Sequence, residues 1–229
     1  QENRNVYAYQ GNLSVKNLLQ IPKSTTTFGW SVQHNQNNIG LNNAIGRTLT
    51  DAVNEFDIKE TNYALFLKER IQIVDKLTLL AGIRGDFFNF NVTEIVPISQ
   101  KGSTTAFRLS PKLSLYYDAT ENIQFYAKAS SGFHSNYSNA AVTNKNIHPL
   151  PKAVGYDLGT EFKIGKNFVG NIASYYLKSD AEFVFGTDGF EFENKGRSQR
   201  IGSEASFRYQ PLPYLWFDTD LNYSYGTLL

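Results

Sequence analysis

From about residue 59 onward, apolar and polar residues alternate along the chain with a period of two. In the segment 61–73, Leu65 and Leu67 stand at odd positions, whereas Lys68 and Arg70 stand at even positions. Such alternation predicts a strand with one apolar and one polar face. The same pattern recurs at 77–87, 107–117, 123–129, 156–164, 201–209 and 215–225. The segment 168–177 is apolar at both parities, so it predicts a strand without a defined register.

The expected strands are long, and the connections between them alternate in length. Strands of roughly 10 to 14 residues exceed the usual length in globular sheets and suit a tilted strand that crosses a bilayer. Short turns are expected at 75–76, 119–122, 165–167 and 210–214, and long loops at 36–58, 92–105, 133–152 and 179–196. In the last of these, 186–194 predicts a hairpin that turns at Asp188-Gly189. Short turns at one rim and long loops at the other are typical of outer-membrane barrels.

The stretch GIRGDFFNF (82–90) indicates which face meets lipid. Ile83 and Phe87 share one face, and Arg84 and Asp86 share the other. Because an ion pair facing lipid is costly, the charged face is expected to line a wet interior. The residues expected to face this lumen are Arg70, Arg84, Asp86, Arg108, Lys112, Lys128, Asp157, Glu161, Glu204 and Arg208.

Aromatic residues gather near the predicted strand ends, where amphipathic rings favour the level of the lipid headgroups. They are Phe87, Phe88, Phe90, Tyr116, Tyr117, Phe133, Tyr175, Tyr176, Tyr209, Tyr214, Trp216 and Tyr225. A soluble β-sandwich with aromatic strand ends is the alternative, although long regular strands favour the membrane barrel.

Composition excludes several classes of protein. Lysine and arginine (22) nearly balance aspartate and glutamate (21), so no overall field indicates a nucleic acid partner. There is no cysteine, which excludes a disulfide framework and a thiolate metal site. No run of 18 apolar residues exists, so a membrane-spanning helix is not expected, whereas membrane-spanning strands remain possible.

The chemistry-bearing residues stand mainly in the loop 133–152. Phe133, His134, Asn136, Tyr137 and His148 combine aromatic and polar groups that suit an organic or chelated ligand. Two histidines without a nearby carboxylate make a weak metal site, so no metal site and no cofactor are expected. Ser135 beside His134 does not form a nucleophile and base, because adjacent residues of an extended chain point in opposite directions. We therefore expect no enzyme activity.

Several segments resemble, in order, the C-terminal part of the barrel of a TonB-dependent outer-membrane receptor. They are residues 60–92, 110–136, 150–164 and 194–225, and the most specific succession is GIRGDFF, SPKLSL, SSGFHSN, GYDLGTEF and GRSQRIGSEASF. This resemblance implies an all-β, antiparallel up-and-down transmembrane β-barrel of 22 strands. About ten or eleven strands are expected here, so 1–229 would form part of that barrel, with no plug domain.

The resemblance also implies a bacterial outer-membrane location and import of a scarce nutrient, such as an iron–siderophore complex, haem, cobalamin or a metal chelate. The implied partners are outer-membrane lipid, the small nutrient ligand and the inner-membrane TonB energising complex, which would act through a plug region outside this chain. Two alternatives stay open: a passive porin-type channel, and a soluble β-domain that binds carbohydrate or protein.

Overall fold

The computed structural model describes residues 2–18, 20–96, 100–134, 142, 148–185, 192–194 and 196–229. Ten strands form a single antiparallel sheet in the order β1-β2-β3-β4-β5-β6-β7-β8-β11-β12. Apart from the step from β8 to β11, each strand pairs with the next one in the chain, as in an up-and-down barrel wall. A separate two-stranded hairpin, β9 and β10, comes between β8 and β11 in the sequence.

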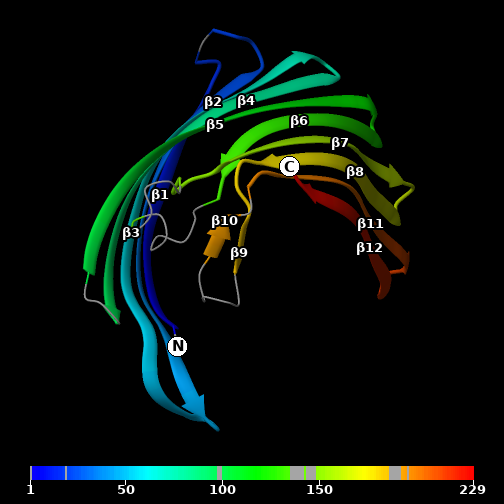
Figure 1. Cartoon of the computed structure of the whole chain (residues 1–229). Helices are drawn as coiled ribbons and strands as arrows, with labels where there is room; N and C mark the ends of the chain where they lie inside the picture. Colours follow the sequence, from blue (N-terminus) through cyan, green and yellow to red (C-terminus); the bar gives the residue numbers. More distant parts are fainter. Residues whose placement is uncertain are drawn as a thin grey trace.

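The strands of the main sheet range from 11 to 27 residues. Their bounds are β1 Glu2–Lys16, β2 Ser24–Ile45, β3 Thr48–Val74, β4 Leu77–Val96, β5 Gln100–Thr120, β6 Ile123–Phe133, β7 Lys152–Ile164, β8 Phe168–Ser179, β11 Ser198–Leu212 and β12 Leu215–Leu228. The hairpin consists of β9 Phe183–Phe185 and β10 Phe192–Asn194. The sheet curves strongly, and β9 and β10 lie inside the curve (Figure 1).

Two of the four predicted long loops are wrong, because strands occupy most of 36–58 and 92–105. β2 and β3 stay paired from Asn35↔Glu60 to Ile45↔Thr48, and Gly46 at the turn has a φ of 65°. β4 continues to Val96, and β5 begins at Gln100. Asparagine is frequent in 36–58 and threonine and serine in 92–105, and any apolar alternation in these extensions is short and interrupted. Backbone hydrogen bonds pair two strands whatever the polarity of their side chains. Alternation with a period of two therefore does not predict a strand that lies outside an apolar layer.

The other predicted connections agree better with the structure. β6 ends at Phe133 and β7 begins at Lys152, so the loop 133–152 separates two strands as expected. The pairing of Phe183–Phe185 with Phe192–Asn194 shows a hairpin that begins before the predicted bounds of 186–194, and its expected turn, Asp188-Gly189, lies outside the described residues. The ambiguous segment 168–177 forms β8, in which Ile172 and Tyr176 share one face and Ala173 and Tyr175 the other.

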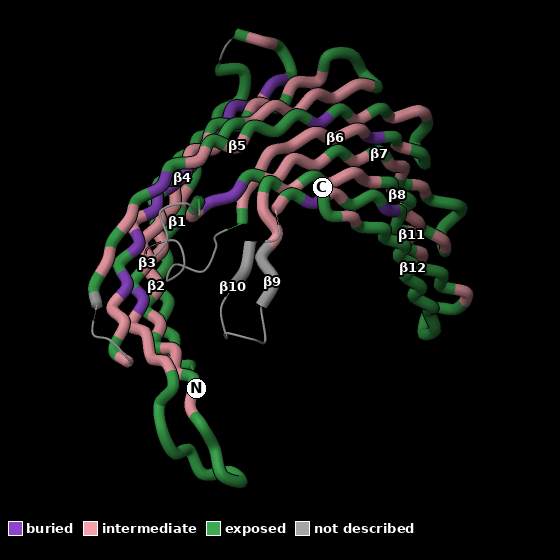
Figure 2. Tube along the Cα trace, viewed as in Figure 1, coloured by how far each residue is buried: buried purple, intermediate pink, exposed green. Residues whose placement is uncertain are grey.

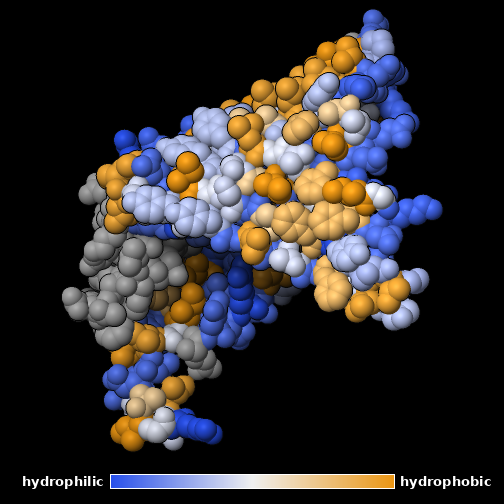
Figure 3. All heavy atoms as spheres, turned by 90° about the vertical axis from the view of Figure 1, so that its right-hand side faces the viewer, coloured by the Kyte–Doolittle hydropathy of each residue, from blue (hydrophilic) through white to orange (hydrophobic). Residues whose placement is uncertain are grey.

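One face of the sheet is apolar and widely exposed. Leu65 is 58%, Ile83 43% and Leu113 52% exposed, and we call the face that carries these three residues the outer face. Figure 3 shows apolar side chains gathered on the side of the molecule that lies at the right of Figure 1. A soluble protein rarely leaves such a continuous apolar surface in water, so lipid is the solvent that fits it. Among the described residues, no helix is long and apolar enough to cross a membrane.

Buried residues lie mainly on β2 to β5 (Figure 2). Phe88 and Phe90 are 7% and 0% exposed, and their neighbour Ala106 is also buried. These rings lie on the face opposite Ile83 and Phe87, where they form a cluster with Leu150. Their predicted place at the headgroup level is therefore wrong. The pattern of the sequence showed aromatic residues near a strand end, but it did not reveal that a returning loop covers two of them.

Candidate ligand-binding site

The pairing register brings the ten residues expected in a lumen to one face of the sheet. Directly paired residues of an antiparallel ladder point to the same side. Register links Arg70 to Leu80, Leu80 to Ser114, Ser114 to Lys128 and Lys128 to Asp157. The strands carry the remaining members at matching parity: Arg84, Asp86, Arg108, Lys112, Glu161, Glu204 and Arg208. We call this side the inner face, since Leu150 and Phe90 pack together on it.

Arg84 and Asp86 form the most buried ion pair of the described inner face. Asp86 is 2% exposed and accepts hydrogen bonds from Arg84 Nη2 and Nε, each at 2.9 Å. Asn62 Nδ2 donates to the same carboxylate at 3.2 Å, and Arg84 Nη2 also donates to Ser31 at 3.2 Å. The carboxylate is thus satisfied by donors from β3 and β4, which makes this pair a fixed part of the wall.

A hydrophobic cluster lies beyond this ion pair, toward the long connection between β6 and β7. Leu150 and Phe90 are each 0% exposed, and Phe88 and Ala106 complete the buried part of the cluster. The Phe88 and Phe90 rings stack with centroids 5.4 Å apart, and Phe133 meets Phe88 edge-on at 5.6 Å. The end of the connection is therefore docked on the inner face by apolar burial.

Arg108 ties the same segment to β5 through polar contacts. Its Nη2 donates to the Leu150 carbonyl oxygen and lies 3.2 Å from His148 Nε2. The Leu150 backbone N–H donates to His148 Nδ1 at 3.0 Å, which requires that nitrogen to be unprotonated. Burial and the nearby positive charge of Arg108 lower the pKa of His148, while Asp180 opposes this shift.

We expect acidification to loosen the contact between residues 148–150 and β5. A histidine whose pKa is lowered in the docked state binds protons more readily when undocked, so docking is strongest above about pH 6.5 and weakens as pH falls. Hydrogen exchange of peptides covering 148–152 at pH 7.5 and 5.5, corrected for the intrinsic rate, measures this effect. His148→Gln should abolish the pH dependence. If the dependence persists in that variant, another group is responsible.

The residues expected to bind ligand are only partly brought together. Phe133 joins the hydrophobic cluster, and His148 contacts Arg108. His134 lies exposed just after β6, where its backbone N–H donates to the Pro151 carbonyl oxygen at 3.3 Å. Asn136 and Tyr137 lie outside the described residues. Within the described parts of the chain, no group of three His, Cys, Asp or Glu side chains could hold a metal ion.

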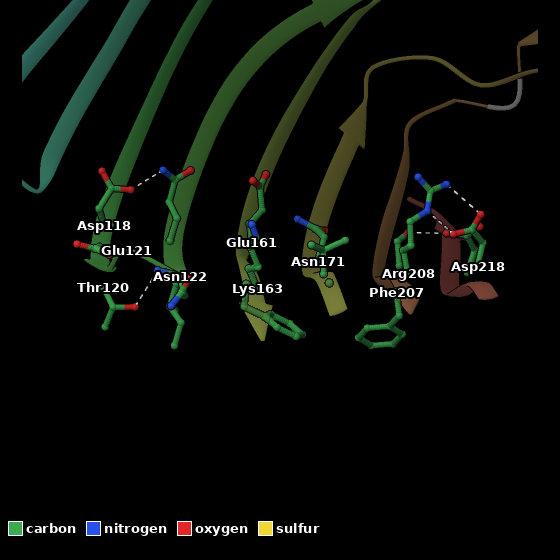
Figure 4. A pocket seen from close by; sticks show the side chains of 17 residues that line it. Asp118, Thr120, Glu121, Asn122, Glu161, Lys163, Asn171, Phe207, Arg208 and Asp218 are labelled. Atoms are coloured by element: carbon green, nitrogen blue, oxygen red, sulfur yellow. Dashed lines mark hydrogen bonds and ion pairs between the residues drawn. The ribbon is translucent and has the colours of Figure 1, made fainter. Parts of the chain in front are cut away.

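A hollow of about 680 Å³ lies at the short-turn end of the inner face (Figure 4). Arg208 donates to Asp218 at 2.6 and 2.9 Å, and Gln124 Nε2 donates to Asp118 at 2.6 Å. Acidic groups outnumber basic ones in its lining, which includes Asp118, Glu121, Glu161, Asp218 and Asp220 against Lys163 and Arg208. The sequence predicted that Asp218 and Asp220, two residues apart, share one face of a strand. Only the pairing register shows that Asp118 of β5 and Glu161 of β7 lie on the same face.

The comparison with known families decides the identity of this sheet. The family model described as "TonB dependent receptor-like, beta-barrel" matches residues 1–228. The chain belongs to this family. Members of the TonB-dependent receptor family are outer-membrane transporters and not enzymes, which agrees with the expected lack of catalytic activity. The predicted all-β, antiparallel barrel architecture and the resemblance read from the sequence are therefore confirmed.

Solved structures of transporters share the fold at low sequence identity. The unliganded ferric citrate transporter FecA is 17% identical, with a TM-score of 0.76 over 98% of this chain and 36% of its own. The alcaligin outer-membrane receptor FauA from Bordetella pertussis is 15% identical, with a TM-score of 0.71 over 99% and 39%. The copper transporter OprC is 14% identical, with a TM-score of 0.69 over 98% and 38%. The chain thus spans less than two fifths of these structures, and a comparison with curated protein sequences found no match.

Proposed function

We propose that this chain forms part of the barrel wall of an energised receptor in the bacterial outer membrane. The receptor would bind a scarce nutrient, such as an iron–siderophore complex, haem, cobalamin or a metal chelate, and import it with force from the inner-membrane TonB complex. That complex would act through a plug region. The outer face would contact lipid, and the inner face would line the interior of the barrel.

The observation that carries this proposal is the match of the family model to residues 1–228. The two faces of the sheet support it, because the outer face exposes Leu65 and Leu113 while the inner face carries charged residues such as Arg70 and Lys128. A lipid-facing wall with a polar interior has this distribution. The family also favours energised import over the passive channel and the soluble domain considered from the sequence.

Dependence of uptake on the TonB complex tests the proposal. Cells that express the complete receptor are grown in nutrient-limited medium, and the loss of metals and small organic solutes from the medium is followed by mass spectrometry. We expect at least one solute to disappear only when both the receptor and the inner-membrane complex are present. Uptake that is unaffected by removal of the complex would indicate a passive channel.

The long connection between β6 and β7 is proposed to contact the ligand. Loops on a rigid barrel are free to carry recognition, whereas the strands are committed to pairing and to lipid. Phe133, His134, Asn136, Tyr137 and His148 are the proposed contact residues of this connection. Deletion of 136–147 from the complete receptor should therefore weaken uptake of the solute identified above. Unchanged affinity and unchanged uptake would remove this connection from the binding site.

A further inference from the structure

The outer face changes from apolar to polar at one row of aromatic residues. Tyr63, Phe87 and Phe107 are paired across β3, β4 and β5, and all three are exposed. Leu77, which begins β4 at the short-turn end, stands ten positions before Phe87, a distance of about 33 Å along the strand. A strand tilted by about 40° rises about 25 Å over that length, which is the height of the apolar band of an outer-membrane barrel. The aromatic row therefore marks the edge of the lipid on the side of the long loops.

Beyond the aromatic row, β2 to β5 continue as strands, and their outer face is polar. The next three rows contain one residue from each of these four strands, and none of these residues is aliphatic. We call these side chains the polar array: His34, Thr61, Asn89 and Thr105 in the first row, Gln36, Lys59, Asn91 and Ser103 in the second, and Asn38, Asp57, Thr93 and Lys101 in the third. The array thus lies on the outside of the barrel wall, above the lipid.

The polar array is held rigidly, carries little net charge and is open to its surroundings. β3 and β4 are paired on both sides in all three rows, which fixes the backbone beneath the side chains. Lys59 Nζ lies 3.7 Å from an Asp57 carboxylate oxygen, so their charges offset each other. The exposed members of the array are Gln36, Asn38, Lys59, Asn91, Lys101, Ser103 and Thr105. Each exposed amide or hydroxyl offers both donors and acceptors of hydrogen bonds to a partner outside the wall.

The composition of the array distinguishes between the partners that can reach it. A surface that binds phosphate gathers arginine and lysine, whereas the array contains no arginine, and one of its two lysines is paired with Asp57. A protein interface is anchored by tryptophan, tyrosine, arginine or large apolar residues, and the array contains none of these. Sugar hydroxyls donate and accept hydrogen bonds alike, and so do the amides and hydroxyls of the array. The array therefore suits a neutral saccharide.

We propose that the polar array binds the saccharide headgroup of a glycolipid in the outer leaflet beside the barrel. The acyl chains of this lipid lie against the outer face below Tyr63 and Phe87, so the array continues the surface that contacts lipid. Gln36, Asn91 and Ser103 contact the sugar hydroxyls from three strands of the second row. The inference goes beyond the proposed function, because this site lies outside the barrel and is independent of the solute that is imported.

Glycolipid binding to the complete receptor in detergent micelles tests this inference. Native mass spectrometry measures the affinity for three probes: lipopolysaccharide with its core saccharide, lipid A without the core, and phosphatidylethanolamine. We expect the core-bearing probe to bind at least about tenfold more tightly than the other two. The double variant Gln36→Ala/Asn91→Ala should remove most of this preference, because several neutral hydrogen bonds are lost. The preference should persist when NaCl is raised from about 50 to 500 mM, because neutral groups carry it.

The matched control is the double variant Gln33→Ala/Asn35→Ala, which removes the same two residue types from the inner face of β2. Gln33 Nε2 donates to Asn35 Oδ1 at 3.0 Å on that face, away from the array. This variant should keep the full preference for the core-bearing probe.

Three results would overturn the inference: equal binding of the probes with and without the core, full preference in the array variant, or equal loss in both double variants. Receptor dimers that disappear in the array variant, while glycolipid binding is unchanged, would make a second copy of the receptor the occupant and overturn it as well. TonB-independent uptake of the imported solute would contradict the proposed function and leave glycolipid binding intact. Failure of the two proposals is therefore distinguishable.

Discussion

Replacing Leu65 by arginine is expected to destabilise the barrel by about 2 to 4 kcal/mol, the cost of a cation near the middle of a lipid-facing strand. Leu65 is 58% exposed on the outer face, where it is paired with Trp30 on β2 and with Gly85 on β4. Neither neighbour offers an anion, so the guanidinium would have to reach for the membrane surface. Urea unfolding of the complete receptor in phospholipid vesicles measures the loss, and the amount of folded protein in the outer membrane should fall with it.

Lys68→Gln provides the control for assembly, because Lys68 stands on the opposite face of the same strand. Its side chain is exposed on the inner face, so removal of the charge should leave the free energy of unfolding nearly unchanged. The contrast depends only on which face meets lipid. Equal destabilisation by the two substitutions would mean that the outer face is not in contact with a hydrocarbon layer.

The sequence predicted the faces of the strands well where period-two alternation was clear. Leu65, Ile83 and Leu113 lie on one side and Arg70 and Arg84 on the other, because a slip of one residue would exchange every side chain between two different solvents. The same argument failed at 36–58 and 92–105. In 36–58 the alternation is short and interrupted: Ile39 and Leu41 stand at odd positions of β2, but Asn43 follows them, and the register shifts between Leu41 and Ala44.

The contacts on the inner face were less predictable, because the residues that meet there come from different segments of the chain. Lys68 and Lys112 are both paired with Gly82. This pairing depends on the register of β3, β4 and β5, which alternation within one strand does not reveal. The contact of Arg108 with His148 and Leu150 depends on the return of a loop over the sheet. Parity could assign Arg108 and Lys112 to a face, but it could not identify what each side chain meets on that face.

Phe90→Ala should release the end of the β6–β7 connection from the inner face. Phe90 is 0% exposed, stacks on Phe88 and belongs to the same cluster as the fully buried Leu150. Truncation to alanine therefore removes a ring from the surface on which Leu150 packs. Replacing a buried phenylalanine by alanine costs about 3 to 5 kcal/mol. Because about 1.4 kcal/mol corresponds to a factor of ten, the lower value predicts a loss of hydrogen-exchange protection of roughly a hundredfold in peptides covering 148–152.

Phe107→Ala is the matched control for this change. Phe107 is 61% exposed on the outer face of β5, one residue after the buried Ala106, so the same truncation removes no contact with Leu150. Exchange at 148–152 should therefore stay as in the unmodified receptor. Loss of protection in both variants would indicate general loosening of β4 and β5, and unchanged protection in Phe90→Ala would show that Leu150 is not held by the hydrophobic cluster. In that second case Arg108 would be the main anchor, and Arg108→Gln should then release the segment even though Phe90 is intact.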